Sequence, residues 1–174
     1  MFTLKQLALP GVFHLQPVRR DDRRGSFVKL MHAEFFQSHG LRSDFVEQYL
    51  TRSHKNVVRG MHFQRPPADH AKLVTCTEGA ILDVVVDLRR DLPSYGQLVS
   101  LQLDAASGGL VYIPSGCAHG FLTLSDSAAT LYSVTSLYSP EHDDGVLWSS
   151  IGFDWPCADP ILSERDQGFA PLAG

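Results

Sequence analysis

The chain has 174 residues and a formal net charge of -4, with 44% hydrophobic and 20% charged residues. These values are ordinary for a globular protein with one sizeable core, and we expect a single domain. They give no reason to expect binding to nucleic acid or to a membrane surface. A small anionic ligand stays compatible with them, because local clusters of Arg and Lys decide its binding.

Three cysteines, Cys76, Cys117 and Cys157, are an odd number and show no C-x-x-C spacing. They predict neither a disulfide framework nor a zinc signature, and a reducing compartment is the simplest interpretation. Residues 1–10 lack the sustained apolar core of a signal peptide, and no apolar run approaches the length of a membrane span. We therefore expect a cytoplasmic protein without membrane contact.

The first part of the chain predicts two strands and a helix. Residues 11–17 alternate in the manner of an edge strand, and residues 26–30 have strand character again. Between them, residues 19–25 (RRDDRRG) predict a charged, solvated loop. Residues 33–39 (AEFFQSH), followed by Gly40, predict one short helix with a glycine stop.

From residue 45 onward the sequence predicts strand after strand, separated by turn signals. This spacing is typical of an all-β fold, here a jelly-roll barrel with a few short peripheral helices. In the single domain 1–174 we expect N-terminal strands and the helix in 1–45, the barrel core in 46–140 and an extension in 141–174 that includes a helical turn. The predicted strands are 45–50, 57–64, 72–76, 80–88, 97–104, 110–114, 121–124 and 129–138, and the turn is at 162–168.

The segment from Pro114 to His119 has the spacing P-x-G-x-x-H, which resembles the second motif of the cupins, the small jelly-roll barrels. The first cupin motif normally supplies H-x-H and a downstream Glu as metal ligands. Here His62 is followed two positions later by Gln64, so a metal site would lack its usual three or four donors. We therefore predict a cupin-type barrel without a metal, whose histidines are free for acid–base chemistry.

Three of the predicted strands carry reactive side chains at alternating positions: His62 on one, Lys72 on the next, and Tyr132 and Tyr138 on a third. If these faces all point into the barrel, one cavity holds a base, a cation and two phenols. That set suits removal of a proton next to a carbonyl, with the cation at the enolate oxygen and a phenol as proton donor. Arg59 has the opposite parity and would reach this cavity only through a bulge at the neighbouring glycine.

Each of these residues also has an ordinary structural role. A single histidine on a half-apolar strand is more often a core residue, lysine is most often exposed, and the tyrosines could be core aromatics with their hydroxyls at the rim. Ser163 and Asp166 have the spacing of a capping box at a helix start. What favours a catalytic site is that all these candidate residues occur in one chain together with the P-x-G-x-x-H motif.

Longer motifs extend the pattern over nearly the whole chain. The most specific are Arg59-Gly60-Met61-His62-Phe63-Gln64 and Pro114-Ser115-Gly116-Cys117-Ala118-His119-Gly120-Phe121, accompanied by Asp22-Arg23-Arg24-Gly25-Ser26-Phe27, Lys72-Leu73-Val74, Leu131-Tyr132 and Leu162-Ser163-Glu164-Arg165-Asp166. In these motifs the sequence resembles the dTDP-4-dehydrorhamnose 3,5-epimerase family, metal-independent cupin epimerases of nucleotide sugars.

The resemblance implies that His62 is the base and that Asp166 holds it in its tautomer. Tyr132 would be the acid on the opposite face of the sugar, and Lys72 would stabilise the enolate. The resemblance also implies a homodimer that exchanges an N-terminal strand, and no cofactor, because the ketone already acidifies the neighbouring C–H bonds. The residues that would contact the nucleotide-diphosphate sugar are Arg24 and Arg59 at the diphosphate, Tyr138 at the nucleotide end, and Phe27, Glu47, Gln48 and His119.

Residues 45–51 (FVEQYLT) depart from the family, which typically reads Val-Gln-Asp-Asn-His-Ser there. Glu47 replaces Gln and Tyr49 replaces Asn, and Arg165 replaces the usual Lys before the aspartate. A carboxylate near a diphosphate is unfavourable, so Glu47 must point away or contact sugar hydroxyls. These changes keep the proton-transfer residues but leave open the sugar, the nucleotide and the number of inverted centres.

We therefore expect an epimerase of a nucleotide-linked 4-keto-6-deoxyhexose that inverts C3 and C5, as in the conversion of dTDP-4-dehydro-6-deoxyglucose to dTDP-4-dehydrorhamnose. The alternatives within sugar chemistry are an epimerase of C3 or C5 alone on another dTDP- or GDP-linked sugar, and a sugar 3,4-ketoisomerase. Outside it stand a non-catalytic sugar-binding cupin and a metal-dependent, dioxygenase-like barrel, against which the missing H-x-H argues.

Overall fold

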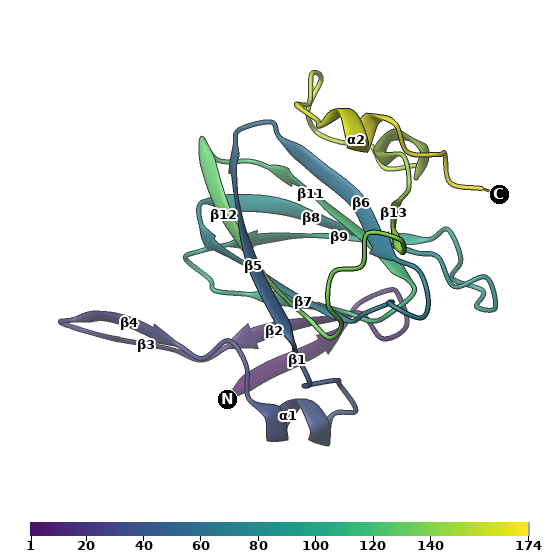
Figure 1. Ribbon diagram of the computed structural model, residues 1–174. Coiled ribbons are helices and arrows are strands. Elements are labelled where there is room, and N and C mark those ends of the chain that lie inside the picture. The colour runs from purple at the N-terminus through teal and green to yellow at the C-terminus, as the bar shows by residue number, and fades with distance from the viewer. Residues whose placement is uncertain (174) are drawn as a thin grey trace.

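The computed structural model describes residues 1–173 and consists almost entirely of β-strands. Two twisted sheets face each other and form a jelly-roll barrel, which confirms the predicted all-β, cupin-type fold (Figure 1). The first sheet has the strand order β1-β2-β10-β7-β12-β5, and the second has the order β13-β6-β11-β8-β9. Neighbouring strands run antiparallel in both sheets.

The elements have the following bounds. The first sheet contains β1 (Phe2–Gln6), β2 (Phe13–Pro17), β5 (Glu47–His54), β7 (Lys72–Glu78), β10 (Leu110–Ile113) and β12 (Ser127–Val134). The second contains β6 (Val58–Gln64), β8 (Ala80–Asp87), β9 (Leu98–Asp104), β11 (Cys117–Thr123) and β13 (Asp143–Gly145). Outside them lie the hairpin β3 (Arg19–Asp22) and β4 (Gly25–Val28), the helices α1 (Ala33–Ser38) and α2 (Glu164–Gln167), and the 3-10 turn η1 (Trp148–Ser150). Within residues 1–173, no helix has the length and apolar character needed to cross a bilayer.

The core between the sheets is built from side chains that alternate inward along facing strands. Val74 and Cys76 of β7 and Val111 of β10 meet Val85 of β8 and Phe121 of β11 there, and all five side chains are buried. This packing fixes which face of each strand points into the barrel, and therefore which polar residues reach its interior.

Apolar layers also cover the outer faces of the two sheets. The segment after β13 packs Ile151 and Trp155 against Met61 and Val84 of the second sheet, and α1 packs Phe36 against the first. Because the second sheet is covered on both faces, the sequence of β8 (AILDVVVD) is a nearly continuous apolar run rather than a strict alternation.

The N-terminal part differs from the prediction in its strand pairing. The sequence predicts an edge strand at 11–17, but β2 lies inside the first sheet, between β10 and β1. The edge is β1, which the composition of residues 1–10 does not reveal as a strand. The predicted helix is confirmed as α1, whose Phe36 is fully buried and which is followed by Gly40 at a φ of +70°.

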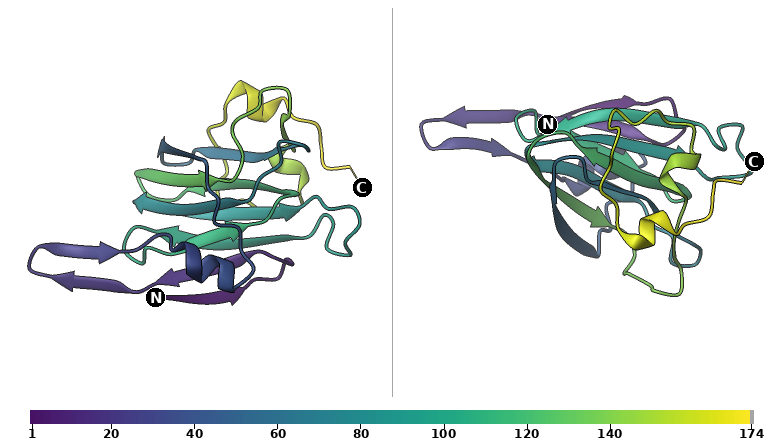
Figure 2. Two further views of the ribbon diagram at one scale, coloured as in Figure 1. Left: turned by 60° about the horizontal axis from the view of Figure 1, so that its bottom comes forward. Right: turned by 90° about the horizontal axis from the view of Figure 1, so that it is seen from above.

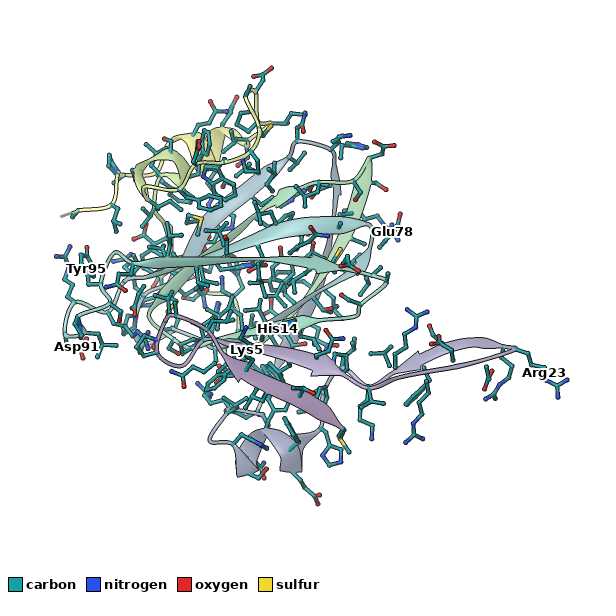
Figure 3. The ribbon with its side chains drawn as sticks, turned by 180° about the vertical axis from the view of Figure 1, so that it is seen from behind. Lys5, His14, Arg23, Glu78, Asp91 and Tyr95 are labelled. Atoms are coloured by element: carbon teal, nitrogen blue, oxygen red, sulfur yellow. The ribbon has the colours of Figure 1, made fainter. Side chains whose placement is uncertain are left out.

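The charged segment at residues 19–25 is not a loop, contrary to prediction, but lies within the hairpin β3–β4. The hairpin projects away from the barrel in every view (Figures 1 and 2), and Arg23 at its tip points away from the body (Figure 3). All four residues of β3 are exposed, so the charge content indicates exposure correctly but does not reveal the backbone pairing. An isolated two-stranded hairpin is only marginally stable.

A β-bulge in β6 positions the residues around His62. The ladder between β6 and β11 slips between the pairs made by His62 and Arg59, so that two residues of β6 stand against one of β11. Gly60 occupies this bulge at a φ of +140°, where an added Cβ would lie 2.5 Å from the Cα of Gly120. A residue with a side chain cannot take this place without a backbone shift.

Candidate active site

His62 and Asp166 form a close pair although 104 positions separate them. His62 Nε2 lies 2.8 Å from Asp166 Oδ1, and the second carboxylate oxygen accepts a hydrogen bond from the backbone N–H of Gly60 at 3.1 Å. Asp166 is only 3% exposed. The bulge of β6 and the helix α2 together hold this carboxylate against the imidazole.

The predicted helix start at Ser163 is also real. Ser163 is the N-cap of α2, and its hydroxyl accepts a hydrogen bond from the backbone N–H of Asp166 at 3.1 Å. The Asp166 carboxylate does not return to the cap, however, because both of its oxygens are directed at β6. The backbone N–H of Asp166 therefore takes part in the helix cap, whereas its carboxylate forms the pair with His62.

Charge states at the pair follow from burial and from the hydrogen bond. Burial would raise the pKa of Asp166, but the hydrogen bond and charge of His62 and the backbone N–H of Gly60 leave that pKa lowered, so the carboxylate is ionised. Burial lowers the pKa of His62, which outweighs the raising effect of Asp166 and favours the neutral imidazole. An ionised carboxylate only accepts, so Nε2 carries the proton and Nδ1 keeps a free lone pair.

Lys72, at the start of β7, is a buried cation beside this histidine. Its ammonium donates a hydrogen bond to the backbone carbonyl of His62 at 3.0 Å, and the residue is 5% exposed. Burial lowers the pKa of Lys72 to about 8, against the raising influence of Asp143 and Asp83. The ammonium is therefore mostly charged at neutral pH and close to the point of losing its proton.

A cavity of about 300 Å³ opens between the two sheets at this point. It collects side chains from β5, β6, β7, the end of β12 and β13, from the segment after β12, and from α2. The base and the cation that alternation predicts for one cavity do lie in one, together with Tyr138. The lining residues are Glu47, Tyr49, His62, Phe63, Gln64, His70, Lys72, Val134, Ser136, Tyr138, Asp143 and Arg165.

Tyr132 lies deeper than the prediction suggests. It is 6% exposed and does not line the cavity; the ring of Tyr49 stacks on it with centroids 4.6 Å apart and lines the cavity in its place. Burial raises the pKa of Tyr132, so its phenol keeps its proton at neutral pH. Tyr49 is 38% exposed, and burial, followed by the charges of Glu47 and Asp143, raises its pKa to about 12.

His119 is a second paired histidine, fully enclosed in the second sheet. Its Nε2 lies 2.7 Å from Asp83 Oδ2, and the two residues are 3% and 0% exposed. The ring meets Tyr132 edge to face at 5.9 Å. His119 therefore stands behind the cavity rather than on its wall, where the prediction has it.

The other predicted contact residues divide between the cavity and the outside. Glu47 lines the cavity, whereas Gln48 points to the other face of β5 and donates a hydrogen bond to Ser133. Arg59 turns toward β5 and donates from Nε to the Ser53 hydroxyl at 2.9 Å. Arg24 and Phe27 lie on the projecting hairpin, exposed, and the single chain does not bring them to His62.

The mouth of the cavity contains residues that the sequence motifs do not single out. Asp143 of β13 forms an ion pair with Arg165 at 2.6 Å and accepts a hydrogen bond from the Tyr138 hydroxyl at 3.3 Å. Phe169 packs on Gly145 and meets the His62 ring edge to face at 5.8 Å. A short strand such as β13 leaves almost no periodic signal, so its register could not be read from sequence.

Fold and site together define a class of protein. Within residues 1–173 no group of three or more His, Cys, Asp or Glu side chains is arranged to hold a metal ion. The cavity of this jelly roll presents instead a neutral imidazole oriented by a carboxylate, beside a buried ammonium, which is the equipment for moving a proton next to a carbonyl. The class is a cupin-type proton-transfer enzyme.

Comparison with known proteins makes the assignment specific. A family model described as dTDP-4-dehydrorhamnose 3,5-epimerase matches residues 6–174. The dTDP-4-dehydrorhamnose 3,5-epimerase of Salmonella typhimurium (strain LT2) is 40% identical, with 99% of this chain and 96% of that protein covered. The dTDP-4-dehydrorhamnose 3-epimerase of Streptomyces niveus is 39% identical, covering 98% of this chain and 84% of that protein.

A solved structure agrees along the whole chain. The dTDP-6-deoxy-D-glucose-3,5-epimerase of Legionella pneumophila Philadelphia 1, in complex with dTDP-4-keto-L-rhamnose, matches with a TM-score of 0.94 at 30% identity, covering 99% of this chain and 93% of that chain. The chain belongs to the dTDP-4-dehydrorhamnose 3,5-epimerase family and is an isomerase of nucleotide sugars.

Proposed function

We propose that this protein inverts C3 and C5 of a dTDP-linked 4-keto-6-deoxyhexose, converting dTDP-4-dehydro-6-deoxyglucose into dTDP-4-dehydrorhamnose. The observation that carries the proposal is the His62–Asp166 pair at 2.8 Å in the same cavity as Lys72. The Legionella protein with dTDP-4-keto-L-rhamnose bound supports the choice of sugar and nucleotide. The reaction needs no cofactor, because the 4-keto group acidifies the C–H bonds on both sides of it.

In the first step His62 removes a proton from the carbon next to the carbonyl. The free lone pair on Nδ1 accepts the proton, and the ionised Asp166 stabilises the imidazolium that forms. The electron pair of the broken C–H bond moves onto the carbonyl oxygen, where the ammonium of Lys72 compensates the developing charge. Burial strengthens both interactions, because the cavity has a lower dielectric constant than water.

In the second step a proton returns to the opposite face of the carbon and the carbonyl re-forms. Tyr132 is the proposed acid: it lies in the first sheet, whereas His62 lies in the second, so the two groups are on opposite sides of the cavity. Its raised pKa keeps the proton available at neutral pH. Inversion follows because removal and return use different faces.

Residues in and around the cavity are proposed to bind the substrate. Arg59 would hold the diphosphate, and Tyr138 would pack against the nucleotide end. Glu47 accepts a hydrogen bond from the backbone N–H of Tyr138 at 2.9 Å, which directs its carboxylate toward that segment and favours a contact with hydroxyls over one with phosphate. His119, bound to Asp83, would act from behind by supporting Tyr132.

We infer further that the protein works as a homodimer. Arg24 and Phe27 are expected at the substrate but lie on a hairpin that leaves the barrel, with Phe27 61% exposed. A second copy can receive this hairpin, which accounts for the exposed aromatic ring and for a hairpin without a covered face. Strands β1 and β2 share a sheet with the barrel, which supports one domain over 1–174. The free cysteines support a cytoplasmic location.

The test is incorporation of solvent deuterium into dTDP-4-dehydro-6-deoxyglucose, followed by NMR at each carbon. The wild type should exchange the protons at C3 and C5 and yield the inverted sugar. His62→Asn should lose about 10²–10⁴-fold in exchange rate at both carbons, the usual contribution of a general base. Wild-type protein that exchanges neither proton, or His62→Asn protein that exchanges both at the normal rate, would exclude this function. A carbonyl that moves to C3 would instead identify a ketoisomerase.

A further inference from the structure

Two phenols lie in the sheet opposite the base, one lining the cavity and one buried behind it. Tyr49 of β5 and Tyr132 of β12 are direct cross-strand partners, and their rings stack with centroids 4.6 Å apart and planes inclined by 17°. Tyr132 is 6% exposed, whereas Tyr49 is 38% exposed and lines the cavity together with His62 and Lys72. The phenol that a bound sugar meets first is therefore Tyr49.

This placement matches a requirement of the chemistry. Epimerisation at two carbons removes two protons through one base and must return two protons on the opposite face. His62 belongs to the second sheet, and both tyrosines belong to the first. C3 and C5 flank the carbonyl carbon on one ring, and the two stacked phenols lie on the side of the cavity opposite the base.

We propose that Tyr49 is a second proton donor of this site, and that Tyr49 and Tyr132 each return a proton to one of the two carbons. The inference rests on the proposed function, because only a reaction at both C3 and C5 needs two donors.

The other hydroxyls of the cavity are less suited to this role, since their protons are already engaged. The Tyr138 hydroxyl donates to Asp143 at 3.3 Å, and the Ser136 hydroxyl donates to the backbone carbonyl of Ala68 at 2.6 Å. Within the described part of the chain, burial and the charges of Glu47 and Asp143 raise the pKa of the Tyr49 phenol, and no hydrogen bond contributes to this shift. That phenol has its proton free for a ligand.

The proton transfer balances in atoms and charge. The O–H bond of Tyr49 breaks as the electron pair of the enolate forms the new C–H bond, and the carbonyl re-forms. A pKa raised to about 12 keeps the phenol protonated until then, yet a phenol is still a stronger acid than the C–H bond it creates, so the transfer is downhill. The phenolate regains a proton from water at the mouth of the cavity, His62 releases its proton to water, and the Lys72 ammonium in the same cavity stabilises the phenolate meanwhile.

The experiment is deuterium exchange into dTDP-4-dehydro-6-deoxyglucose, read separately at C3 and C5 by NMR, with Tyr49→Phe. This variant removes one hydroxyl and keeps the stacked ring. Tyr132→Phe is measured beside it, and Tyr95→Phe serves as the matched control, because its hydroxyl contacts the backbone of Ala173 away from the cavity. Melting temperature and the Kd for dTDP report on folding and nucleotide binding in each variant.

We expect Tyr49→Phe to lose about 10²–10⁴-fold in inversion at one carbon, even where His62 still exchanges the proton there, while inversion at the other carbon stays within a few-fold of wild type. Tyr132→Phe should show the opposite selectivity, and Tyr95→Phe no change. Equal loss at both carbons in Tyr49→Phe, or no loss, overturns the second donor while the proposed function stands. Wild type that exchanges only one carbon also overturns it, and wild type that exchanges neither removes the proposed function as well.

Discussion

At the scale of single residues, Lys72 and His62 set the range of pH in which the site can work. Burial lowers the pKa of Lys72 to about 8, so its charge is lost as the pH rises through that value. Burial also lowers the pKa of His62 below its ordinary value of about 6.5, so the neutral base persists into mildly acidic solution. The two groups are in their active forms together between these limits.

The rate of C3 and C5 exchange should therefore fall on the alkaline side near pH 8 and on the acid side below pH 6.5. Lys72→Met should lose about 10²–10³-fold in kcat, as for the loss of one donor at a developing oxyanion, and should abolish the alkaline limb. The measurement is kcat/KM against pH. The same change at Lys55, an exposed lysine, is the control, and an alkaline limb that persists in Lys72→Met would assign it to another group.

Asp166 allows its two structural roles to be tested apart. Asp166→Asn keeps the helix cap but removes the ionised partner of His62, and we expect kcat to fall about 10²–10⁴-fold with little change in the Kd for dTDP. Ser163→Ala removes the cap and should cost about 0.5–2 kcal/mol in the free energy of unfolding while kcat changes little. Kinetics and urea unfolding of both variants provide the measurement. The prediction fails if Asp166→Asn loses only stability.

At the scale of elements, the bulge in β6 is what turns a regular strand into part of a site. Gly60 lies in the bulge two residues before His62, and its backbone N–H and the His62 ring both contact α2. The two oxygens of Asp166 bind both of these groups, so α2, the bulge and the imidazole form one unit.

Gly60→Ala should therefore be strongly disruptive. Its φ of +140° and the 2.5 Å approach of an added Cβ to Gly120 require a backbone shift, and we expect a loss of about 2–5 kcal/mol in the free energy of unfolding together with most of the activity. The control is Gly40→Ala: its φ is +70° but no atom lies within 4 Å of an added Cβ, so a cost near 1 kcal/mol and normal activity are expected. Urea unfolding compares the two, and equal costs would contradict the role of the bulge.

At the scale of the whole molecule, the hairpin β3–β4 is the part of the chain that the barrel does not use. It extends away from the body (Figure 2) and contains Arg24, expected at the diphosphate, and Phe27, expected to contact the substrate. If a second copy receives it, each active site contains residues from both chains. A substitution in the hairpin of one chain then affects the active site of its partner.

A mixture of two inactive variants tests this arrangement. His62→Ala keeps the hairpin and loses the base, whereas Arg24→Ala keeps the base and loses the hairpin arginine. When the two are unfolded and refolded together in equal amounts, half of the dimers are hybrids, and each hybrid has one intact site, so about a quarter of wild-type activity should appear. Variants refolded separately and then mixed at once give the baseline. A mixture no more active than that baseline would place Arg24 outside the partner's site.

The sequence predicted the all-β fold and the helix α1, because alternation and turn residues are local signals. It also predicted that His62 and Lys72 share one cavity, since alternation turns both side chains inward on their strands. It did not reveal β13, which is too short to show a period, or β1, whose alternation covers only Phe2 to Lys5, and it placed Tyr132 and His119 on the cavity wall although packing holds both behind it.

What the sequence by itself determined was the chemistry available: a base, a carboxylate, a cation and several phenols on strands of known parity. Only the tertiary structure decided their order in space. Alternation along a strand determines which face of the sheet a side chain takes. It does not determine how deeply that side chain is buried, because burial depends on which neighbouring side chain covers it. Tyr49 covers Tyr132 because cross-strand register, a long-range property, sets the two rings side by side.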